Sequence, residues 1–366
     1  MKVLFMISHP AHFHMFRYTM DNLKHDGHEI VAVIRPKDVL ESLCENAGLS
    51  FYKVKDRPKR WGLIGLGFSL VGKTQEVLKI ARREKPDLLV GSDGVLAVVG
   101  KLIHKPSFEW FEDDVSIIKL YARLFFPLYT NIVSPTVCDA GKWANKQIVY
   151  PGYQKLAYLH PMRFTPDKTI VEKYFPVDKP YFLLRFSQLS AHHDQGIHGF
   201  TTEIAQRVID MLSPHGAVFI TSEKELPPQF EPFRLRINPL DIHHVMAFAK
   251  LYVGDSQSMA VEACMLGTPA LRFNDFVGDK KISVLEELEH TYGLTCAIHS
   301  SQPDQLYMKL DEWLAIPNLN QEWHHRREKM LSEKIDVTAF YTWFLQDFPE
   351  TLEKIRQGNF TWNQFR

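Results

Sequence analysis

The stretch that decides the fold is GDSQSMAVEACMLGTPALRF, which occupies residues 254–273. The apolar residues before it, 251–253, predict a buried strand. Ser256 is a favourable N-cap for the helix that follows, and Gly267 comes just after its end, where a left-handed residue is common. Pro269 then opens the next strand. This order of strand, polar turn, helix and strand is typical of an α/β domain.

The start of this helix has the chemistry of an anion site. Backbone amides at a helix N-terminus and the helix dipole both favour a phosphate group. Ser256, Gln257 and Ser258 would present those amides, and Glu262, one to two turns later, could accept hydrogen bonds from a ribose. The alternative is a strand, loop and helix of an ordinary α/β core that binds no ligand.

The same run resembles known donor-binding segments. It is similar to the donor-nucleotide segment of GT-B enzymes and to the DSGGxxEEAxxLGxPxL segment of the UDP-N-acetylglucosamine 2-epimerases. Ser256, Gln257 and Ser258 replace the two glycines of the epimerase run, so the backbone approaches a phosphate less freely. The resemblance implies a nucleoside-diphosphate-sugar donor, with UDP as the expected nucleotide and Glu262 on its ribose.

Strand and helix patterns alternate along the 366 residues, which predicts two doubly wound parallel sheets of the α/β class. Strands are expected at residues 3–7, 29–34, 51–54, 88–91, 107–111 and 131–134, and then at 181–186, 217–221, 234–237, 251–254, 270–273 and 295–298. Helices are expected at residues 13–25, 37–47, 70–83, 95–103, 302–314, 321–332 and 336–357, the last with a break at Pro349. We expect an N-terminal domain over 1–158, a C-terminal domain over 159–335, and helices of 336–366 that pack back on the first domain. Residues 160–180 contain four prolines and are expected to form a hinge.

Two Rossmann-like halves and a helical tail resemble the GT-B layout. That fold implies two domains facing across a cleft, with the acceptor on the N-terminal domain and the donor nucleotide on the C-terminal one. Most of the chain also resembles the family named domain of unknown function 354. The matching segments are SHPAHFHMF, KPDLLVGSD, YPGYQKLAYL, LRFS and SAHHDQG, which begin at residues 8, 85, 150, 184 and 190. The family name itself implies no reaction.

The first loop after a strand, residues 8–14, contains three histidines. Ligands of open α/β sheets bind beside such loops, and a histidine can take a proton from a sugar hydroxyl near neutral pH. The resemblance to inverting GT-B enzymes implies that His12 is the general base and that Asp93, in the Ser92-Asp93 pair, holds it. The alternative is that His12 only caps the loop. The spacing of the three histidines does not favour a metal site.

The second half carries the other candidates for nucleotide-sugar binding. Arg185 follows an apolar strand and could pair with a diphosphate through two hydrogen bonds. The other candidates are Ser187 in the same turn, His193 in the SAHHDQG loop, Thr221 and Ser222 at a strand end, and Ile242 before a helix. The SAHHDQG loop could equally be a polar surface loop.

Two other functions stay open. A UDP-N-acetylhexosamine 2-epimerase would use acidic residues near Asp93 and Glu112 and a histidine near His193. The EAGLR run of those epimerases is absent, however, and His9-Pro10 replaces their arginine loop. The third possibility is a non-catalytic protein that binds a nucleotide-sugar.

Residues 55–73, KDRPKRWGLIGLGFSLVGK, are basic and then apolar. With Arg57, Lys59 and Arg60 beside an apolar run, this segment suits an anionic membrane surface or a lipid-linked acceptor. The alternative is a loop that packs its apolar residues under the first domain.

Composition limits the remaining functions. The formal net charge is zero, so we expect no nucleic-acid partner. The four cysteines have no paired spacing, which predicts neither disulfides nor a zinc site. No apolar stretch reaches 18 residues. The GT-B resemblance implies a metal-independent glycosyltransferase without a cofactor, which would transfer sugar to a glycan or lipid-linked acceptor in surface polysaccharide synthesis. We expect this enzyme to be cytoplasmic and, if the basic segment binds lipid, peripheral at the inner face of the membrane.

Overall fold

The computed structural model describes the chain except for residues 38, 56–61, 187–198, 223–224 and 278–281, and it does not describe the side chains of 62–69. The described residues form two compact units. One contains Met1–Arg163 with Lys334–Arg366, and the other contains Phe164–Glu333. The first unit therefore extends past residue 158. Arg163 belongs to it because the Arg163 guanidinium binds the Asp336 carboxylate, with Nη2 and Oδ2 2.6 Å apart.

A seven-stranded parallel sheet forms the centre of the first unit, in the order β3-β2-β1-β4-β5-β6-β7. Its strands are β1 (Lys2–Ile7), β2 (Glu29–Ile34), β3 (Phe51–Lys53), β4 (Leu88–Gly91), β5 (Ser107–Trp110), β6 (Asn131–Pro135) and β7 (Gln147–Tyr150). The chain adds strands on one side of β1 and then on the other. The boundary between β1 and β4 is therefore the switch point at which open α/β sheets bind ligands.

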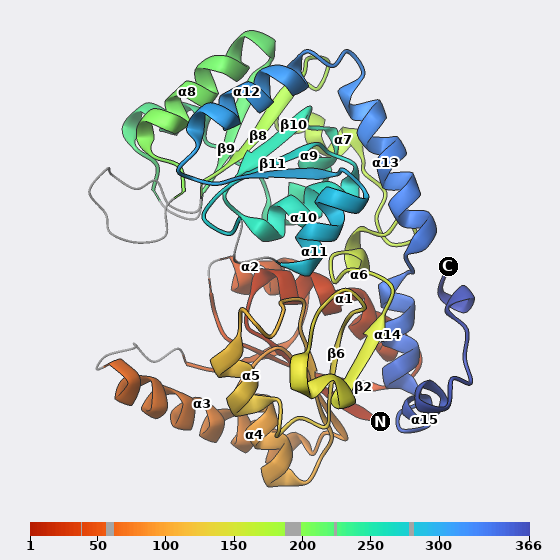
Figure 1. Cartoon of the computed structure of the whole chain (residues 1–366). Helices are drawn as coiled ribbons and strands as arrows, with labels where there is room; N and C mark the ends of the chain where they lie inside the picture. Colours follow the sequence, from red (N-terminus) through yellow and green to blue (C-terminus); the bar gives the residue numbers. More distant parts are fainter. Residues whose placement is uncertain (38, 56–61, 187–198, 223–224, 278–281) are drawn as a thin grey trace. The chain divides into compact units, whose positions relative to one another are not determined.

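Helices cover both faces of this sheet. They are α1 (Pro10–His25), α2 (Leu40–Asn46), α3 (Gly62–Glu84), α4 (Gly94–Ile103), α5 (Lys119–Phe125), α6 (Leu156–Leu159), α14 (Val337–Gln346) and α15 (Glu350–Gln357). Figure 1 shows α3, α4 and α5 together on one side of this unit, with α14 and α15 on the other. Helix α14 packs against α1, and its Tyr341 places a ring 5.4 Å from that of Trp110 and a hydroxyl 2.7 Å from that of Tyr150. The C-terminal helices are thus part of the first unit's core.

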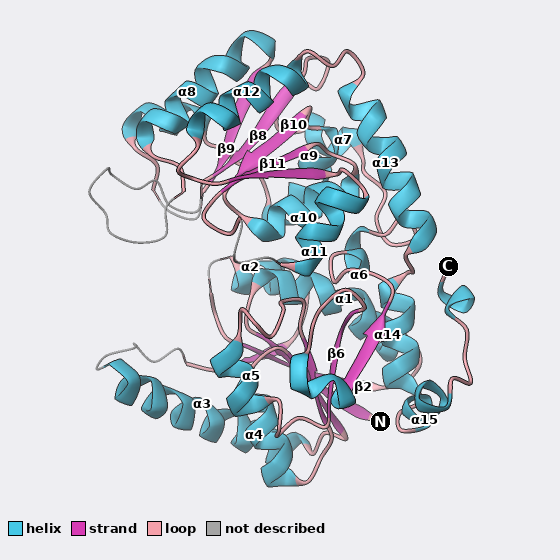
Figure 2. Ribbon diagram, viewed as in Figure 1, coloured by secondary structure: helices cyan, strands magenta, loops and turns pink. Residues whose placement is uncertain are grey.

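The second unit contains a five-stranded parallel sheet in the order β12-β11-β10-β8-β9. Its strands are β8 (Tyr181–Arg185), β9 (Ala217–Thr221), β10 (Leu251–Gly254), β11 (Ala270–Phe273) and β12 (Thr295–Ile298). The helices are α7 (Lys168–Glu172), α8 (Thr202–Leu212), α9 (Ile242–Phe248), α10 (Gln257–Leu266), α11 (Ser283–Glu286), α12 (Pro303–Leu314) and α13 (Leu319–Glu333). Figure 2 shows α8 and α12 on one side of the strands and α9 and α10 on the other. Here the switch point lies between β8 and β10.

The predicted strand, turn, helix and strand are present as β10, α10 and β11. The Ser256 hydroxyl accepts a hydrogen bond from the Met259 amide at 3.4 Å, as an N-cap does. Gly267 ends the helix with φ of +76°, the left-handed geometry that glycine adopts without strain. Two parallel-sheet α/β units confirm the predicted fold class.

Three local predictions were wrong. Residues 234–237 do not form a strand, because Pro232 and Pro239 flank them and only an isolated bridge joins Arg234 to Ile220. The hinge predicted over 160–180 was wrong beyond its first residues: the two units divide inside this stretch, between Arg163 and Phe164, but α7 belongs to the second unit. The helix expected to begin at residue 70 begins at Gly62.

We predict that Gly267→Ala destabilises the second unit more than Gly27→Ala destabilises the first. Both glycines have φ near +80°, where alanine costs about 1–2 kcal/mol. A Cβ at Gly267 would also lie 2.7 Å from His324 Nδ1, whereas a Cβ at Gly27 would meet nothing within 4 Å. Overpacking should add about 1–3 kcal/mol at Gly267. Amide hydrogen exchange, followed separately in each unit, measures both losses, and equal losses would contradict the prediction.

Candidate functional site

Three strand ends meet at the switch point of the second unit. In the sheet register Arg185 lies beside Thr221 on one side and beside Gly254 on the other. The structure therefore brings together the predicted residues Arg185 and Thr221 and the turn that leads into α10. A Cβ on Gly254 would lie 2.9 Å from the Arg185 carbonyl oxygen, so only glycine allows this close approach. Ser222 follows Thr221 directly in the same strand-end segment.

The first turn of α10 supplies hydrogen-bond donors at this edge. The amides of Gln257 and Ser258 belong to the group of N–H donors that have no acceptor inside a helix. The Nε2 atom of Gln257 is buried and has no hydrogen-bond partner among the described residues. A buried donor without a partner is costly, and a bound anion or sugar hydroxyl would satisfy it. The first turn of α10 thus offers main-chain donors and one side-chain donor that lacks a partner among the described residues.

Glu262 is not exposed in the way expected of a residue that binds a ribose. It is buried in the second turn of α10, and its Oε1 lies 3.3 Å from Nε2 of His243 on α9. Ile242 begins α9 and is half-buried. The imidazole thus lies beside the buried carboxylate. A ribose could reach Glu262 only by sharing this carboxylate with His243.

The first unit has a polar cluster at its own switch point, between β1 and β4. His12 lies in the first turn of α1, and its Nδ1 accepts a hydrogen bond from the Ser8 amide at 3.4 Å. The Ser8 hydroxyl donates to Asp93 Oδ2 at 3.0 Å. No hydrogen bond joins His12 directly to Asp93, both of which are described. The predicted direct pair is therefore corrected: Ser8 stands between the two residues.

Asp93 is unavailable to His12 because it caps α4. Its Oδ1 accepts the Val95 amide at 3.1 Å, and its Oδ2 lies 3.9 Å from Nη1 of Arg35. The Asp93 carbonyl accepts the Tyr129 hydroxyl at 2.7 Å. A Cβ on Gly94 would lie 2.6 Å from the Phe125 ring. These contacts hold the Asp93 turn in one geometry.

A second buried carboxyl lies beneath this turn. Glu109 on β5 accepts the Tyr121 hydroxyl at 2.9 Å. Burial raises the pKa of Glu109 to about 8, although hydrogen bonds from Tyr129 and Tyr121 act in the opposite direction. Glu109 is therefore mostly protonated at neutral pH. The sequence did not predict three residues of this cluster, which are Ser8, Tyr121 and Tyr129. Each uses a hydroxyl that no motif marks, and each contacts a residue distant in the sequence.

The His12 imidazole is neutral at neutral pH. Burial lowers its pKa to about 3, and the charges of His9 and Lys155 act in the same direction. In a neutral imidazole, one nitrogen accepts and the other carries the proton. Because Nδ1 accepts the Ser8 amide, the proton is on Nε2. In this form His12 donates a hydrogen bond through Nε2 and cannot accept a proton there.

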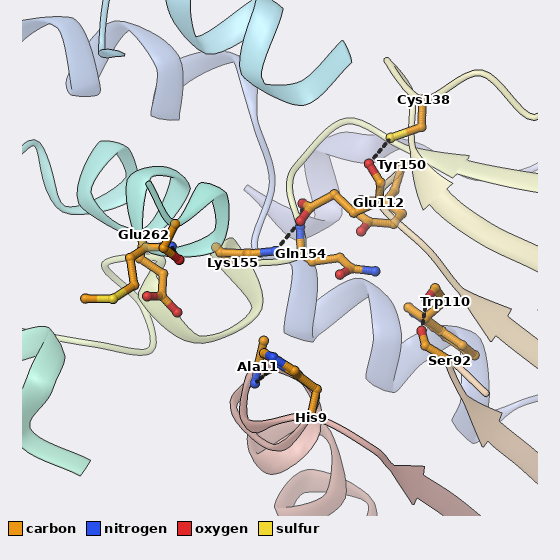
Figure 3. A network of polar contacts seen from close by, with 12 residues as sticks. His9, Ala11, Ser92, Trp110, Glu112, Cys138, Tyr150, Gln154, Lys155 and Glu262 are labelled. Carbon is orange, nitrogen blue, oxygen red and sulfur yellow. Dashed lines mark hydrogen bonds and ion pairs between the residues drawn. The ribbon is translucent and has the colours of Figure 1, made fainter. Parts of the chain in front are cut away.

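The acidic loop after β5 is held by its own pairs. Figure 3 shows the Glu112 carboxylate bound to the Lys155 ammonium and to the backbone of Gln154, whose amide donates to Oε1 at 2.7 Å. The Glu112 and Lys155 side chains are 11% and 9% exposed. Asp114 accepts the Asp139 amide at 2.8 Å. In the described part of the chain, no group of three or more His, Cys, Asp or Glu side chains could hold a metal ion.

Five predicted residues lie outside the described residues. They are Ser187 and His193 in the second half of the chain and Arg57, Lys59 and Arg60 in the basic segment. Their predicted roles stay predictions.

We predict that nitrogen NMR of the imidazole will show His12 neutral, with the proton on Nε2, at pH 7. The resonance should not titrate between pH 5 and 8, because the pKa lies near 3. Since the unfolded chain binds a proton near pH 6.5 and the folded chain does not, His12 should destabilise the fold as the pH falls below 6.5. His12→Gln should reduce that loss. A ring protonated on Nδ1, or one that titrates near pH 6.5, would contradict this assignment.

Comparisons with known proteins agree with the fold. No protein-family model matches the sequence, and no curated protein matches it, so membership in domain of unknown function 354 stays a prediction. UDP-GlcNAc 2-epimerase from Neisseria meningitidis bound to UDP-GlcNAc is 16% identical, with a TM-score of 0.65 over 97% of this chain and 100% of that chain. The Methanocaldococcus jannaschii UDP-GlcNAc 2-epimerase in complex with UDP-GlcNAc and UDP is 13% identical, with a TM-score of 0.62 over 90% of this chain and 99% of the other. The spinosyn rhamnosyltransferase complexed with thymidine diphosphate is 14% identical, with a TM-score of 0.61 over 95% of this chain and all of the other. At these identities the likeness shows the fold, which is the GT-B fold of glycosyltransferases and UDP-GlcNAc 2-epimerases.

Proposed function

We propose that the chain is a glycosyltransferase that moves a sugar from a nucleoside-diphosphate donor, with UDP as the expected nucleotide, to an acceptor hydroxyl. One observation carries the proposal: Arg185, Thr221 and the first turn of α10 converge at the switch point of the second sheet. A cation, a hydroxyl and helix amides together suit a diphosphate. The similar structures named above hold UDP-GlcNAc, UDP or thymidine diphosphate, which supports this ligand class.

On the donor side each residue has a distinct role. Arg185 and the amides of Gln257 and Ser258 would stabilise the negative charge that develops on the leaving diphosphate. Glu262 would share its carboxylate between His243 and the ribose. The backbone at Ile242 would contact the base. No metal ion is needed in this scheme, because the cation and the amides provide the charge stabilisation.

On the acceptor side His12 would remove the proton from the attacking hydroxyl. That step needs Nε2 without its proton, so the proton must first move to Nδ1. In this exchange the Ser8 amide would lose its hydrogen bond to Nδ1, which at 3.4 Å is longer than an ordinary N–H bond to an acceptor and therefore weaker. In the active form Nδ1–H would donate to the Ser8 hydroxyl oxygen, which already donates to Asp93. Asp93 would thus stabilise the imidazolium through Ser8.

A UDP-N-acetylhexosamine 2-epimerase is the second candidate, because two of the similar structures are UDP-GlcNAc 2-epimerases. An epimerase would need an acid near Asp93 that exchanges protons with the sugar. Glu112 is poorly suited to this, since Lys155 and the Gln154 amide occupy its carboxylate. The pairing of Glu112 with Lys155 therefore favours sugar transfer over epimerisation. A role in surface polysaccharide synthesis, with a glycan or lipid-linked acceptor, belongs to the same proposal.

For the donor site, we predict that Arg185→Gln weakens UDP binding by about 2–3 kcal/mol, the scale for hydrogen bonds to a charged group. Glu262→Gln should cost about 1–2 kcal/mol, because the amide still accepts one bond but loses the charge. Glu312→Gln on the exposed face of α12 is the control and should bind as the wild type does. Calorimetry with UDP measures all three. Unchanged affinity in both site variants would remove these residues from the donor site.

Incubation with UDP-N-acetylglucosamine alone separates the candidates. A transferase without acceptor should release UDP slowly by hydrolysis, and His12→Ala should slow that release by about 10²–10⁴ because the general base is gone. The affinity for UDP should stay unchanged in His12→Ala. Formation of the 2-epimer would instead show an epimerase. Binding of UDP with neither product, even with a range of acceptors, would show a non-catalytic binding protein.

A further inference from the structure

The first unit exposes an unusual concentration of apolar side chains on one helical layer. Among the described residues, nine large apolar side chains are exposed, and Val71, Leu102, Leu120 and Leu124 belong to α3, α4 and α5. These helices lie together on one side of the unit (Figure 1), with α3 against α4 and α4 against α5. Leu120 and Leu124 are 62% and 53% exposed. The described part of the chain does not cover them.

Basic residues accompany the leucines. On α5, Lys119 and Arg123 are exposed, and they repeat at the same four-residue spacing as Leu120 and Leu124. Residues four apart lie on the same face of a helix, so a cationic row and an apolar row run side by side. The sequence contains no Asp or Glu in residues 94–108 or 115–138. Positive charge on α4 and α5 is therefore not neutralised by acids of the same segments.

The end of α4 lies near the end of α5. The Lys146 ammonium donates to the carbonyls of Pro127 at 2.9 Å and of Tyr129 at 2.7 Å, just after α5. Lys101, on the last turn of α4, is close enough to lower the pKa of Lys146 further, beyond the larger effect of burial. Because α4 packs against α5, Lys101 and Leu102 lie in the same helical layer as the rows on α5. We call this set, Lys101, Leu102, Lys119, Leu120, Arg123 and Leu124, the α4–α5 patch.

We propose that the α4–α5 patch docks on an anionic lipid surface. Leucines beside cations suit the boundary between acyl chains and negative head groups. A second copy of this chain is a poor partner, because the same cations would then oppose one another. No helix in the described part of the chain combines the length and apolar character that a bilayer-crossing helix needs, so the attachment is one of surface contact. The purpose of this docking rests on the proposed function: a lipid-linked acceptor of the transferase would lie in the same membrane surface.

Flotation of the full chain with vesicles tests the patch. One set of vesicles mixes phosphatidylglycerol with phosphatidylcholine, and the other contains phosphatidylcholine alone. We expect the wild type to float with the anionic vesicles at low salt and to be released at high salt. Lys119→Gln with Arg123→Gln should weaken partition about thirtyfold, since each basic residue near the surface contributes about 1 kcal/mol. Leu120→Gln with Leu124→Gln should weaken it about tenfold or more.

The control is Met308→Gln, which removes an apolar side chain that is 64% exposed on α12 of the other unit. It should float as the wild type does. No flotation of the wild type at low salt, or equal flotation of all variants, would overturn the proposal. If light scattering shows a dimer that the leucine variants abolish, the patch binds a second copy of the chain instead of lipid. UDP calorimetry on the same variants should be unchanged, so failure of the patch and failure of the proposed function are distinguishable.

Discussion

The burial of α10 is the constraint on which the second unit depends. Every residue from Ala260 to Leu266 is buried, so the polar groups at both helix ends need partners from the protein or from a ligand. The C-terminal end is closed by the chain itself. The Thr268 amide donates to the Ala263 carbonyl at 2.9 Å, and the Arg327 guanidinium donates to the Met265 carbonyl. At the N-terminal end the described residues provide the Ser256 cap, and the amides of Gln257 and Ser258 are among the donors that have no acceptor inside the helix. This asymmetry is why a ligand is expected at the first turn.

The two switch points differ in the charge of the groups that cap their helices. In the second unit a neutral serine caps the helix, and Arg185 lies beside it. In the first unit the Asp93 carboxylate caps α4 and the His9 imidazole accepts the Ala11 amide at the start of α1. Because its helix N-termini are already closed, and one of them by a negative charge, the first unit is poorly suited to a phosphate. This difference supports the proposal that an anionic donor binds the second unit and an acceptor hydroxyl the first.

Backbone features were largely predictable, whereas side-chain partners were not. Apolar runs gave the strands at 29–34 and 88–91 as observed, since parallel strands buried on both faces are continuously apolar. The edge strand β7 was missed because its pattern alternates between buried and exposed residues and is short. The His12–Asp93 pairing was wrong because it assumed a family arrangement, while the Ser8 hydroxyl and the cap of α4 compete for the carboxylate. The ion pair of Glu112 with Lys155 joins residues on different loops, which no local pattern indicates.

The states of the buried ionisable groups limit the chemistry near Asp93. Burial raises the pKa of Glu109 to about 8, and the Tyr121 hydroxyl, which lies 3.5 Å from that of Tyr129, donates to the Glu109 carboxyl group. The Glu112 carboxylate is paired with the Lys155 ammonium. Burial keeps His12 neutral, and among these three groups it is the one whose proton can move from one ring nitrogen to the other without breaking a buried ion pair. Epimerisation needs more than one proton-exchanging group on the sugar, whereas inverting transfer needs one base on the acceptor. Among Glu109, Glu112 and His12, the proposed transfer therefore relies on His12.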